Sequence, residues 1–389
     1  RLPFFNRQLI MSRFFKDILK EGDFTITDVF TEVKKDFPSL DLSRIEPLIK
    51  ALVRMRVRIT AISYNTVDPK GNPVVSSGII MRPLNRRPNG VLHFLPSANI
   101  DKFGSGSDAL ILFEGVLSFL GYIIVIPDLL GNGITKDTVE YPFLMAENTG
   151  RVAYDMHRAA IEYFPAILGY PLQKHISIGG YSMGGSGALA LVRHIEQEQP
   201  EDIIIDRAII GGGIYDLNVA FEEFVKTGFA QYPAAPGIFK AYDKWYGLNL
   251  DYSRIFIGPL LENMDSWLDR THFRDQLTQW IGQDLHQYMH PDFFTVERNS
   301  EINKLWKKFR ENSLATGWTP KTHILIAHAE DDLSVPTRVA TYTCEQFRKR
   351  GARLRSHYGK GGHYEFGKWF FLRMGIHLLM KGMAFWTRF

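Results

Sequence analysis

A serine between glycines, in the middle of the chain, stands in a pattern that can produce a nucleophile. Gly180, Ser182 and Gly184 form G-x-S-x-G, with Tyr181 and Met183 between them. A predicted buried strand at 175–179 precedes the serine, and a predicted helix at 183–196 follows it. Glycines at this turn let the chain bend sharply and lift the hydroxyl to the exposed end of a sheet. The alternative is a serine that only caps the helix.

A serine hydroxyl needs a base to take its proton and a carboxylate to orient that base. Glu330, Asp331 and Asp332 follow a predicted strand at 323–327, in a loop that ends in Val335-Pro336. Each of the three could be the acid, whereas a solvated acidic loop that caps the next helix is the plainer interpretation.

The base is predicted from its place after the last strand. His363 follows a predicted strand at 353–358, in the Gly-rich segment 359–362, which we expect to be a flexible loop. His328 lies beside the acidic residues and His357 lies within the strand. The order serine, acid, histidine favours His363.

Other chemistries are less well supported. His328 with Asp331 and Asp332 could bind a metal, but no histidine pair at helical spacing accompanies them. Segment 362–369 resembles a phosphate-binding loop but has Trp369 where a Ser or Thr is required. Gly211 to Gly213 lacks the continuation of a dinucleotide site. We therefore expect neither a metal nor a cofactor.

The elements that must position these residues alternate between short apolar strands and longer helices. This alternation predicts an α/β fold, a mostly parallel sheet with crossover helices, opened by an antiparallel hairpin. Further strands are expected at 57–66, 74–81, 91–95, 122–126 and 205–210, and further helices at 108–120, 146–164, 337–350 and near the C-terminus, within 369–386.

The alternation stops between residues 215 and 320, where aromatic residues and prolines accompany several helical stretches. We interpret this region as a helical cap inserted after the sixth strand. The predicted organisation is a helical extension at 1–56, an α/β core in two parts at 57–214 and 321–389, and the cap at 215–320. A helix docked on the body is expected within Phe4 to Leu19. Aromatic residues of the cap could line a pocket, namely Phe221, Phe224, Tyr232, Trp245 and Trp267.

Composition excludes several classes of protein. The 46 basic and 42 acidic residues are dispersed, which argues against nucleic-acid binding. Cys344 is the only cysteine, so no intrachain disulfide can form. No apolar stretch is long enough to span a membrane, and lipid contact is a minor hypothesis. The start at Arg1 favours a removed leader and a secreted or cell-envelope location, with a cytoplasmic one left open. Nothing indicates the oligomeric state.

Ser182, an acid loop and His363 in this order resemble the α/β-hydrolase superfamily. Several further stretches resemble its secretory-lipase-like esterases: 64–71, Ser77-Gly78, 127–133, 141–143, Asn312-Ser313 and 317–320. The resemblance implies the α/β-hydrolase fold, cleavage of a small-molecule or lipid-like carboxylic ester through an acyl-enzyme, and no cofactor. An Asp three residues before Val-Pro is its usual acid, which selects Asp332.

Two positions depart from that family's pattern. Members commonly carry His-Gly after the third strand for the second oxyanion donor, but here that strand ends in Leu95-Pro96-Ser97. Proline has no N–H, so the second oxyanion donor is predicted to be Ser97. The first is predicted to be Met183, which follows the serine at the start of the helix. Leu129 stands where an aromatic residue is usual, which affects the expected substrate preference.

Three other functions agree with the same residues. A peptidase of the proline-aminopeptidase kind shares the triad and would cleave aminoacyl amides. An acyltransferase would favour an alcohol over water. A hydrolase fold without activity could serve as a binding module.

Overall fold

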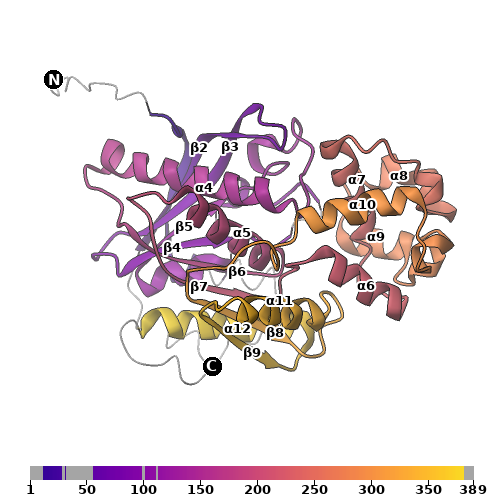
Figure 1. The fold of residues 1–389 in the computed structure, drawn as a ribbon. Coiled ribbons are helices and arrows are strands. Elements are labelled where there is room, and N and C mark those ends of the chain that lie inside the picture. The colour runs from indigo at the N-terminus through magenta and orange to yellow at the C-terminus, as the bar shows by residue number, and fades with distance from the viewer. Residues whose placement is uncertain (1–11, 29–30, 32–55, 99–100, 111–112, 381–389) are drawn as a thin grey trace.

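A sheet of nine strands forms the centre of the protein (Figure 1). The computed structural model describes residues 12–28, 31, 56–98, 101–110 and 113–380. The strand order is β1-β2-β3-β5-β4-β6-β7-β8-β9. Strands β1, β2, β3 and β5 are antiparallel neighbours, and the ladders from β5 to β9 are parallel. The bounds are β1 Phe15–Thr25, β2 Arg56–Val67, β3 Pro73–Pro83, β4 Gly90–Leu95, β5 Tyr122–Pro127, β6 His175–Tyr181, β7 Ile204–Gly211, β8 Ile324–Ala329 and β9 Leu354–Gly359.

Helices cover both faces of the sheet. Helices α4 (Ala146–Tyr163), α5 (Met183–Glu198) and α11 (Thr337–Lys349) bury one face in a core of Val, Ile, Leu and Ala side chains. Helix α12 (Gly362–Leu379) and the 3-10 helix η1 (Phe113–Leu120) pack on the other face. Strands β4, β5 and β8 are therefore buried along their whole length, which explains their continuous apolar sequences.

The helix predicted within Phe4 to Leu19 is wrong for residues 15–19, which begin strand β1. The predicted helical extension at 1–56 is wrong for the same strand, and residues 1–11 and 32–55 lie outside the described residues. Strand β1 pairs antiparallel with β2, and Asp23 forms an ion pair with Arg58 at 2.6 Å. Both faces of β1 are largely exposed, so its sequence has no clear alternation of apolar and polar residues.

The helix predicted at 108–120 is also wrong as a single element. Its region holds the short helix α3 (Gly106–Ala109) and the 3-10 helix η1, with 111–112 outside the described residues. Leu110 has a φ of 62°, a left-handed conformation that ends α3. The terminal helix α12 begins at Gly362, earlier than predicted.

A helical insertion lies between β7 and β8, beside the sheet (Figure 1). Its longer helices are α6 (Leu217–Thr227), α7 (Ala235–Tyr246), α8 (Gly258–Trp267), α9 (Arg274–Ile281) and α10 (Ser300–Glu311). They lie within the predicted interval 215–320, and β7 is the strand predicted as the sixth. The insertion has an apolar core of its own, in which Phe221 stacks on Phe309.

The chain enters and leaves the insertion through a neck of two hydrogen-bonded segments. The N–H of Leu314 donates to the carbonyl of Tyr215 at 2.8 Å. The hydroxyl of Ser313 donates to Asp216 at 2.5 Å, and both side chains are buried. Asp216 also caps α6 by accepting the N–H of Val219. The neck thus joins the two ends of the insertion at one place.

No helix in the described part of the chain has both the length and the apolarity that a membrane span requires.

Candidate active site

Ser182 lies at a strained turn between β6 and α5. Its φ of 58° and ψ of −131° are rarely adopted by a residue with a side chain. The N–H of Ser182 donates to the carbonyl of Gly211 at 2.9 Å, which ties the turn to β7. A Cβ at Gly180 would lie 2.1 Å from the backbone oxygen of Gly184, so only glycine fits there. The glycines of the motif therefore serve close backbone packing, as the sequence predicts.

His363 lies between Ser182 and Asp332. Its Nε2 is 2.9 Å from the Ser182 Oγ, and its Nδ1 is 2.6 Å from Oδ2 of Asp332. The expected loop is wrong for this residue, because His363 is in the first turn of α12. The hydroxyl of Tyr181 donates to the His363 carbonyl at 2.6 Å, which fixes the backbone of that turn. Sequence reasoning did not assign a role to Tyr181.

The carboxylate of Asp332 is buried and held on its far side by the backbone. Its Oδ1 accepts the N–H groups of Ser334 and Val335, both at 2.9 Å. These two bonds leave Oδ2 directed at His363. An oriented carboxylate of this kind keeps the imidazole in one tautomer, with the proton on Nδ1.

Asp331 and Glu330, the other candidate acids, are exposed. Asp331 accepts the N–H groups of Gly361 and Gly362, at 3.0 and 2.9 Å. These bonds lower the pKa of the Asp331 carboxyl. Asp331 thus anchors the glycine turn that leads into His363.

Neither of the two other candidate histidines is hydrogen-bonded to Ser182. His328 is buried beside the acid: its Nε2 donates to the Val335 carbonyl at 2.9 Å and lies 3.5 Å from Oδ2 of Asp332. Burial lowers the pKa of His328. His357 stacks on Trp369 with ring centroids 4.6 Å apart. Within the described residues, no group of three or more His, Cys, Asp or Glu is placed to hold a metal ion.

The predicted oxyanion donors lie where the chain after β4 meets the start of α5. Met183 is the first residue of α5, and the Ser97 hydroxyl donates to the carbonyl of Tyr181 at 3.3 Å. A Cβ at Gly184 would lie 2.2 Å from the backbone oxygen of Leu95, so the two segments touch. Residues 97 and 183 are thus both next to the serine turn.

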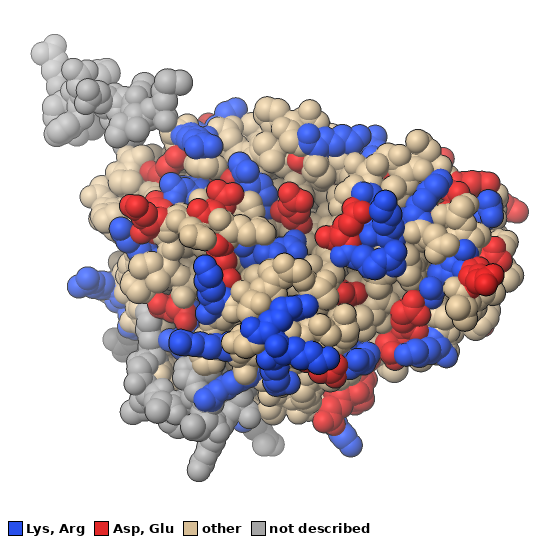
Figure 2. All heavy atoms as spheres, viewed as in Figure 1, with Lys and Arg blue, Asp and Glu red and all other residues tan. Residues whose placement is uncertain are grey.

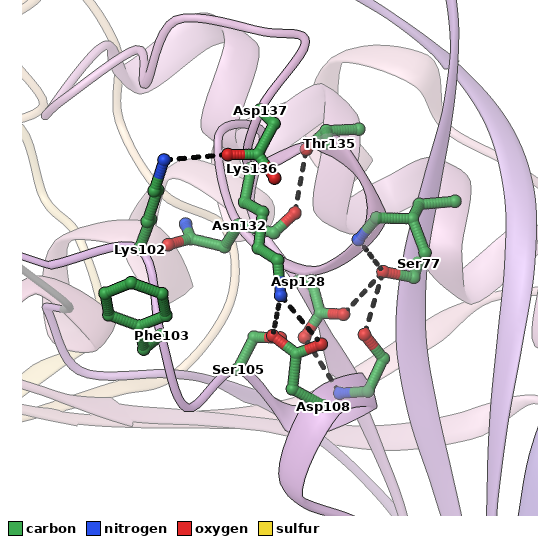
Figure 3. Close-up of polar contacts among 12 residues, drawn as sticks. Ser77, Lys102, Phe103, Ser105, Asp108, Asp128, Asn132, Thr135, Lys136 and Asp137 are labelled. Carbon is green, nitrogen blue, oxygen red and sulfur yellow. Dashed lines mark hydrogen bonds and ion pairs between the residues drawn. The ribbon is translucent and has the colours of Figure 1, made fainter. Parts of the chain in front are cut away.

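A buried carboxylate, Asp128, organises the wall on this side (Figure 3). Its Oδ2 accepts the hydroxyl of Ser77 at 2.6 Å, and its Oδ1 accepts the N–H of Ser107 at 3.3 Å. Burial raises the pKa of Asp128. Asp128, Ser97 and Met183 line a second cavity beside the serine turn. The sequence does place an Asp directly after the apolar strand 122–127, which could have indicated a functional residue. In the sequence analysis this Asp was only part of the segment 127–133 that supports the family resemblance.

A largely apolar pocket opens over the serine and the histidine, and we call it the active-site pocket. Ser182 and His363 lie in its wall, and the insertion supplies much of the remainder. Three of the five aromatic residues that the sequence singled out line it: Phe221, Phe224 and Tyr232. Trp267 lines a separate cavity, and Trp245 packs against the core of the insertion. Leu129 does not line the active-site pocket but lines the second cavity beside the serine turn and a further one between α4 and α5.

The insertion touches α12 beside the histidine. Tyr232 of the pocket wall and Tyr364 are in contact through their hydroxyls, and Arg274 donates to the hydroxyl of Tyr364. Arg274 also lies over the ring of Tyr232, 5.1 Å from its centroid. Nothing in the sequence spacing of these residues predicts this contact.

Figure 2 shows acidic and basic side chains together on one face of the molecule, over the sheet and the insertion alike.

Comparison with known proteins identifies the fold through structure alone. No family model matches the sequence, and no curated protein matches it. A presumed hydrolase from Legionella pneumophila has a similar structure, with a TM-score of 0.78 and 20% identity over 95% of this chain and 100% of that one. The rice cell wall degrading esterase LipA of Xanthomonas oryzae gives a TM-score of 0.72 and 18% identity, over 93% and 96% of the two chains. Candida antarctica lipase A in its closed state gives 0.56 and 12%, over 92% and 83%.

This chain has the α/β-hydrolase fold, as the sequence predicts, and its structural neighbours include esterases and a lipase.

Proposed function

We propose that this chain is a serine hydrolase that cleaves carboxylic esters through an acyl-enzyme intermediate. The observation that carries the proposal is the unbroken series of hydrogen bonds from Ser182 through His363 to Asp332, at 2.9 and 2.6 Å. A hydroxyl, an imidazole and a buried carboxylate in this geometry are the working parts of nucleophilic acyl transfer.

In the first half of the reaction, Ser182 Oγ attacks the carbonyl carbon of the ester and His363 Nε2 takes the hydroxyl proton. The bond between that carbon and the alkoxy oxygen then breaks, and His363 returns the proton to the leaving alcohol. Asp332 stabilises the imidazolium that forms between these steps. Water then attacks the acyl-enzyme with His363 as base, which releases the acid and restores the serine.

Negative charge on the carbonyl oxygen needs donors at the serine turn. The N–H of Met183 belongs to the first turn of α5, where the backbone donors and the helix dipole favour an anion. The backbone N–H of Ser97 is proposed as the second donor, because the chain after β4 packs against this turn.

The active-site pocket supports an ester rather than an aminoacyl substrate. An aminopeptidase must bind a protonated amino group, and a carboxylate in the pocket would serve this purpose. None of the described residues that line the pocket is Asp or Glu. Aliphatic and aromatic side chains dominate its wall, which suits an acyl group.

Labelling with a fluorophosphonate probe tests the proposal directly. We expect one modified residue, Ser182, and loss of p-nitrophenyl butyrate hydrolysis in Ser182→Ala without change in the melting temperature. Ser253→Ala, at an exposed serine of the insertion, should label and hydrolyse as the wild type does. A chain that is folded but neither labels nor hydrolyses esters would indicate a binding module. Cleavage of aminoacyl amides but not esters would indicate a peptidase, and preference for an alcohol acceptor an acyltransferase.

A further inference from the structure

Arg270 lies in the loop between α8 and α9 and extends from the insertion to the body of the protein. Its guanidinium donates to the carbonyl oxygen of Asp101 at 2.9 Å and to Oδ1 of Asn132 at 2.8 Å. It also donates to the carbonyl oxygen of Gly131. In the other direction, the carbonyl of Arg270 accepts the N–H of Lys102 at 3.0 Å. The mechanism proposed above makes no use of these contacts.

Both segments that Arg270 bonds lie beside the serine turn. The first follows β4 and carries Ser97, the proposed second oxyanion donor, shortly before Asp101. The second follows β5, and its Asn132 lines the second cavity together with Ser97 and Met183. Since Met183 is the proposed first donor, Arg270 is bonded to the wall of the cavity that both donors line.

Arg270 also reaches Met183 through one aromatic ring. Its guanidinium carbon lies 4.2 Å from the centroid of the Tyr141 ring, a distance at which the ring face attracts a cation. Tyr141 is buried, and its hydroxyl donates to the sulfur of Met183 at 2.7 Å. The side chain that follows the nucleophile is therefore held by a residue that Arg270 covers.

The backbone of Arg270 has a conformation that residues with a side chain rarely adopt. Its φ is 65°, in the left-handed region. Asp269 fixes the turn from one side by accepting the N–H and the hydroxyl of Thr271, at 2.8 and 2.7 Å. Strain of this kind persists only where the surroundings impose it, and it is frequent at functional sites.

The planar guanidinium suits this position better than an ammonium group would. Partial burial lowers the pKa of Arg270, but a guanidinium stays charged at neutral pH. Its N–H groups point in fixed directions, so it can set the spacing of several acceptors at once. The acceptors named above are main-chain and amide oxygens of two segments, whose relative position Arg270 therefore fixes.

A second bridge between the same two segments is weaker. The ammonium of Lys102 donates to Asp137 at 2.7 Å, as Figure 3 shows. Asp137 is exposed, so solvent screens this ion pair. Arg270 is half-buried and is the stronger constraint.

We infer that Arg270 is a positioning residue for the oxyanion site, which holds the segment of Ser97 against the segment after β5 and the first turn of α5. Both donor N–H groups must lie at hydrogen-bond distance from one oxygen, and a shift of the Ser97 segment removes one of them. The inference rests on the proposed function, because it concerns the carbonyl oxygen of the same ester. It adds that the insertion takes part in the chemistry as well as in forming the pocket.

Arg270→Met tests the inference, because it keeps an unbranched side chain and removes the donors. We expect kcat for p-nitrophenyl butyrate to fall by about 10- to 100-fold, with KM within about threefold of the wild type, since the donors act in the transition state. Arg270→Lys keeps the charge without the planar group and should give an intermediate kcat. Arg298→Lys is the matched control, because Arg298 contacts Glu222 and Trp306 within the insertion, and its kcat and KM should not change.

The corresponding thionoester separates positioning from a general loss of structure. Sulfur in place of the carbonyl oxygen is a weaker hydrogen-bond acceptor, so a thionoester gains less from the oxyanion donors. We expect the ratio of kcat/KM for the ester to that for the thionoester to fall in Arg270→Met along with kcat. An unchanged ratio, an effect on KM alone, or full activity in the folded variant would overturn the inference.

A crystal structure of the wild type with a short alkylphosphonate bonded to Ser182 gives a test without a variant. We expect the phosphoryl oxygen within about 3.1 Å of the backbone nitrogens of Met183 and Ser97, with the bonds of Arg270 to the body present. A phosphoryl oxygen out of reach of the Ser97 nitrogen, or an Arg270 turned away from the body, would refute the inference and leave the proposed function intact. Failure of the wild type to react with any ester or phosphonate would instead refute the proposed function, and the inference with it.

Discussion

The substitution Asp332→Asn removes the charge of the acid and keeps its size, so it isolates what the carboxylate does. Oδ1 of Asp332 accepts two backbone N–H groups, those of Ser334 and Val335. In the variant the amide oxygen must take this position, because an amide NH₂ would meet two donors there. The NH₂ group then faces Nδ1 of His363.

An NH₂ donor at that place forces the wrong tautomer on the histidine. Nδ1 of His363 can accept from it only without a proton, so the proton moves to Nε2, which then cannot accept from Ser182. We expect kcat to fall by about 10⁴-fold, equivalent to about 5.5 kcal/mol in the activation barrier.

Asp331→Asn is the matched control. Its amide oxygen can still accept the N–H groups of Gly361 and Gly362, so we expect kcat to remain within about tenfold of the wild type. The assay is steady-state hydrolysis of p-nitrophenyl butyrate, with the melting temperature measured for both variants. Equal losses, or a larger loss for Asp331→Asn in folded protein, would refute the assignment of Asp332.

Two further predictions concern stability. Gly180→Ala should lower the free energy of unfolding by about 2 kcal/mol or more, because the new Cβ would lie 2.1 Å from the backbone oxygen of Gly184. Gly237→Ala is the control and should not destabilise, because its nearest neighbour is a ring carbon of Phe143 at 3.7 Å. Urea unfolding compares the two variants, and equal stability of both would contradict the reasoning. Burial lowers the pKa of His157, which pairs with His93 at 3.1 Å, to about 4. The unfolded chain takes up the proton first, so stability should fall as the pH drops from about 6.5 to about 4, and His157 alone should contribute about 3 kcal/mol to this loss. Unfolding of His157→Gln should depend less on pH over that range, and parallel curves for the two proteins would count against it.

The parallel part of the sheet could be predicted because burial on both faces leaves a plain signal. Strands such as Tyr122–Pro127 consist of apolar residues throughout, and turn residues bound them. The turn at Ser182 could be predicted for a different reason, since its backbone contacts exclude any side chain at Gly180. The sequence also indicated which histidine to expect, because His363 is the first histidine after the last strand.

Two elements could not be predicted from composition: a strand defined mainly by its backbone ladder, and a helix that begins within a glycine-rich turn. Strand β1 is identified by its ladder with β2, and an exposed ladder leaves little trace in composition. The glycines before His363 suggested a loop, yet Gly361 and Gly362 have φ values of 121° and 61° that lead directly into α12.

The neck between Tyr215-Asp216 and Ser313-Leu314 has a consequence for how such a chain could diversify. Because its two segments are bonded to each other, the chain leaves the sheet and returns to it at one place, while Tyr232 and Arg270 of the insertion make further contacts with the body. Closing a longer or shorter loop there changes the chain entropy only slowly with length. Apart from the loop that carries Arg270, the segment could be shortened, lengthened or exchanged without altering the register of β7 and β8, so the choice of substrate could evolve separately from the machinery that cleaves it.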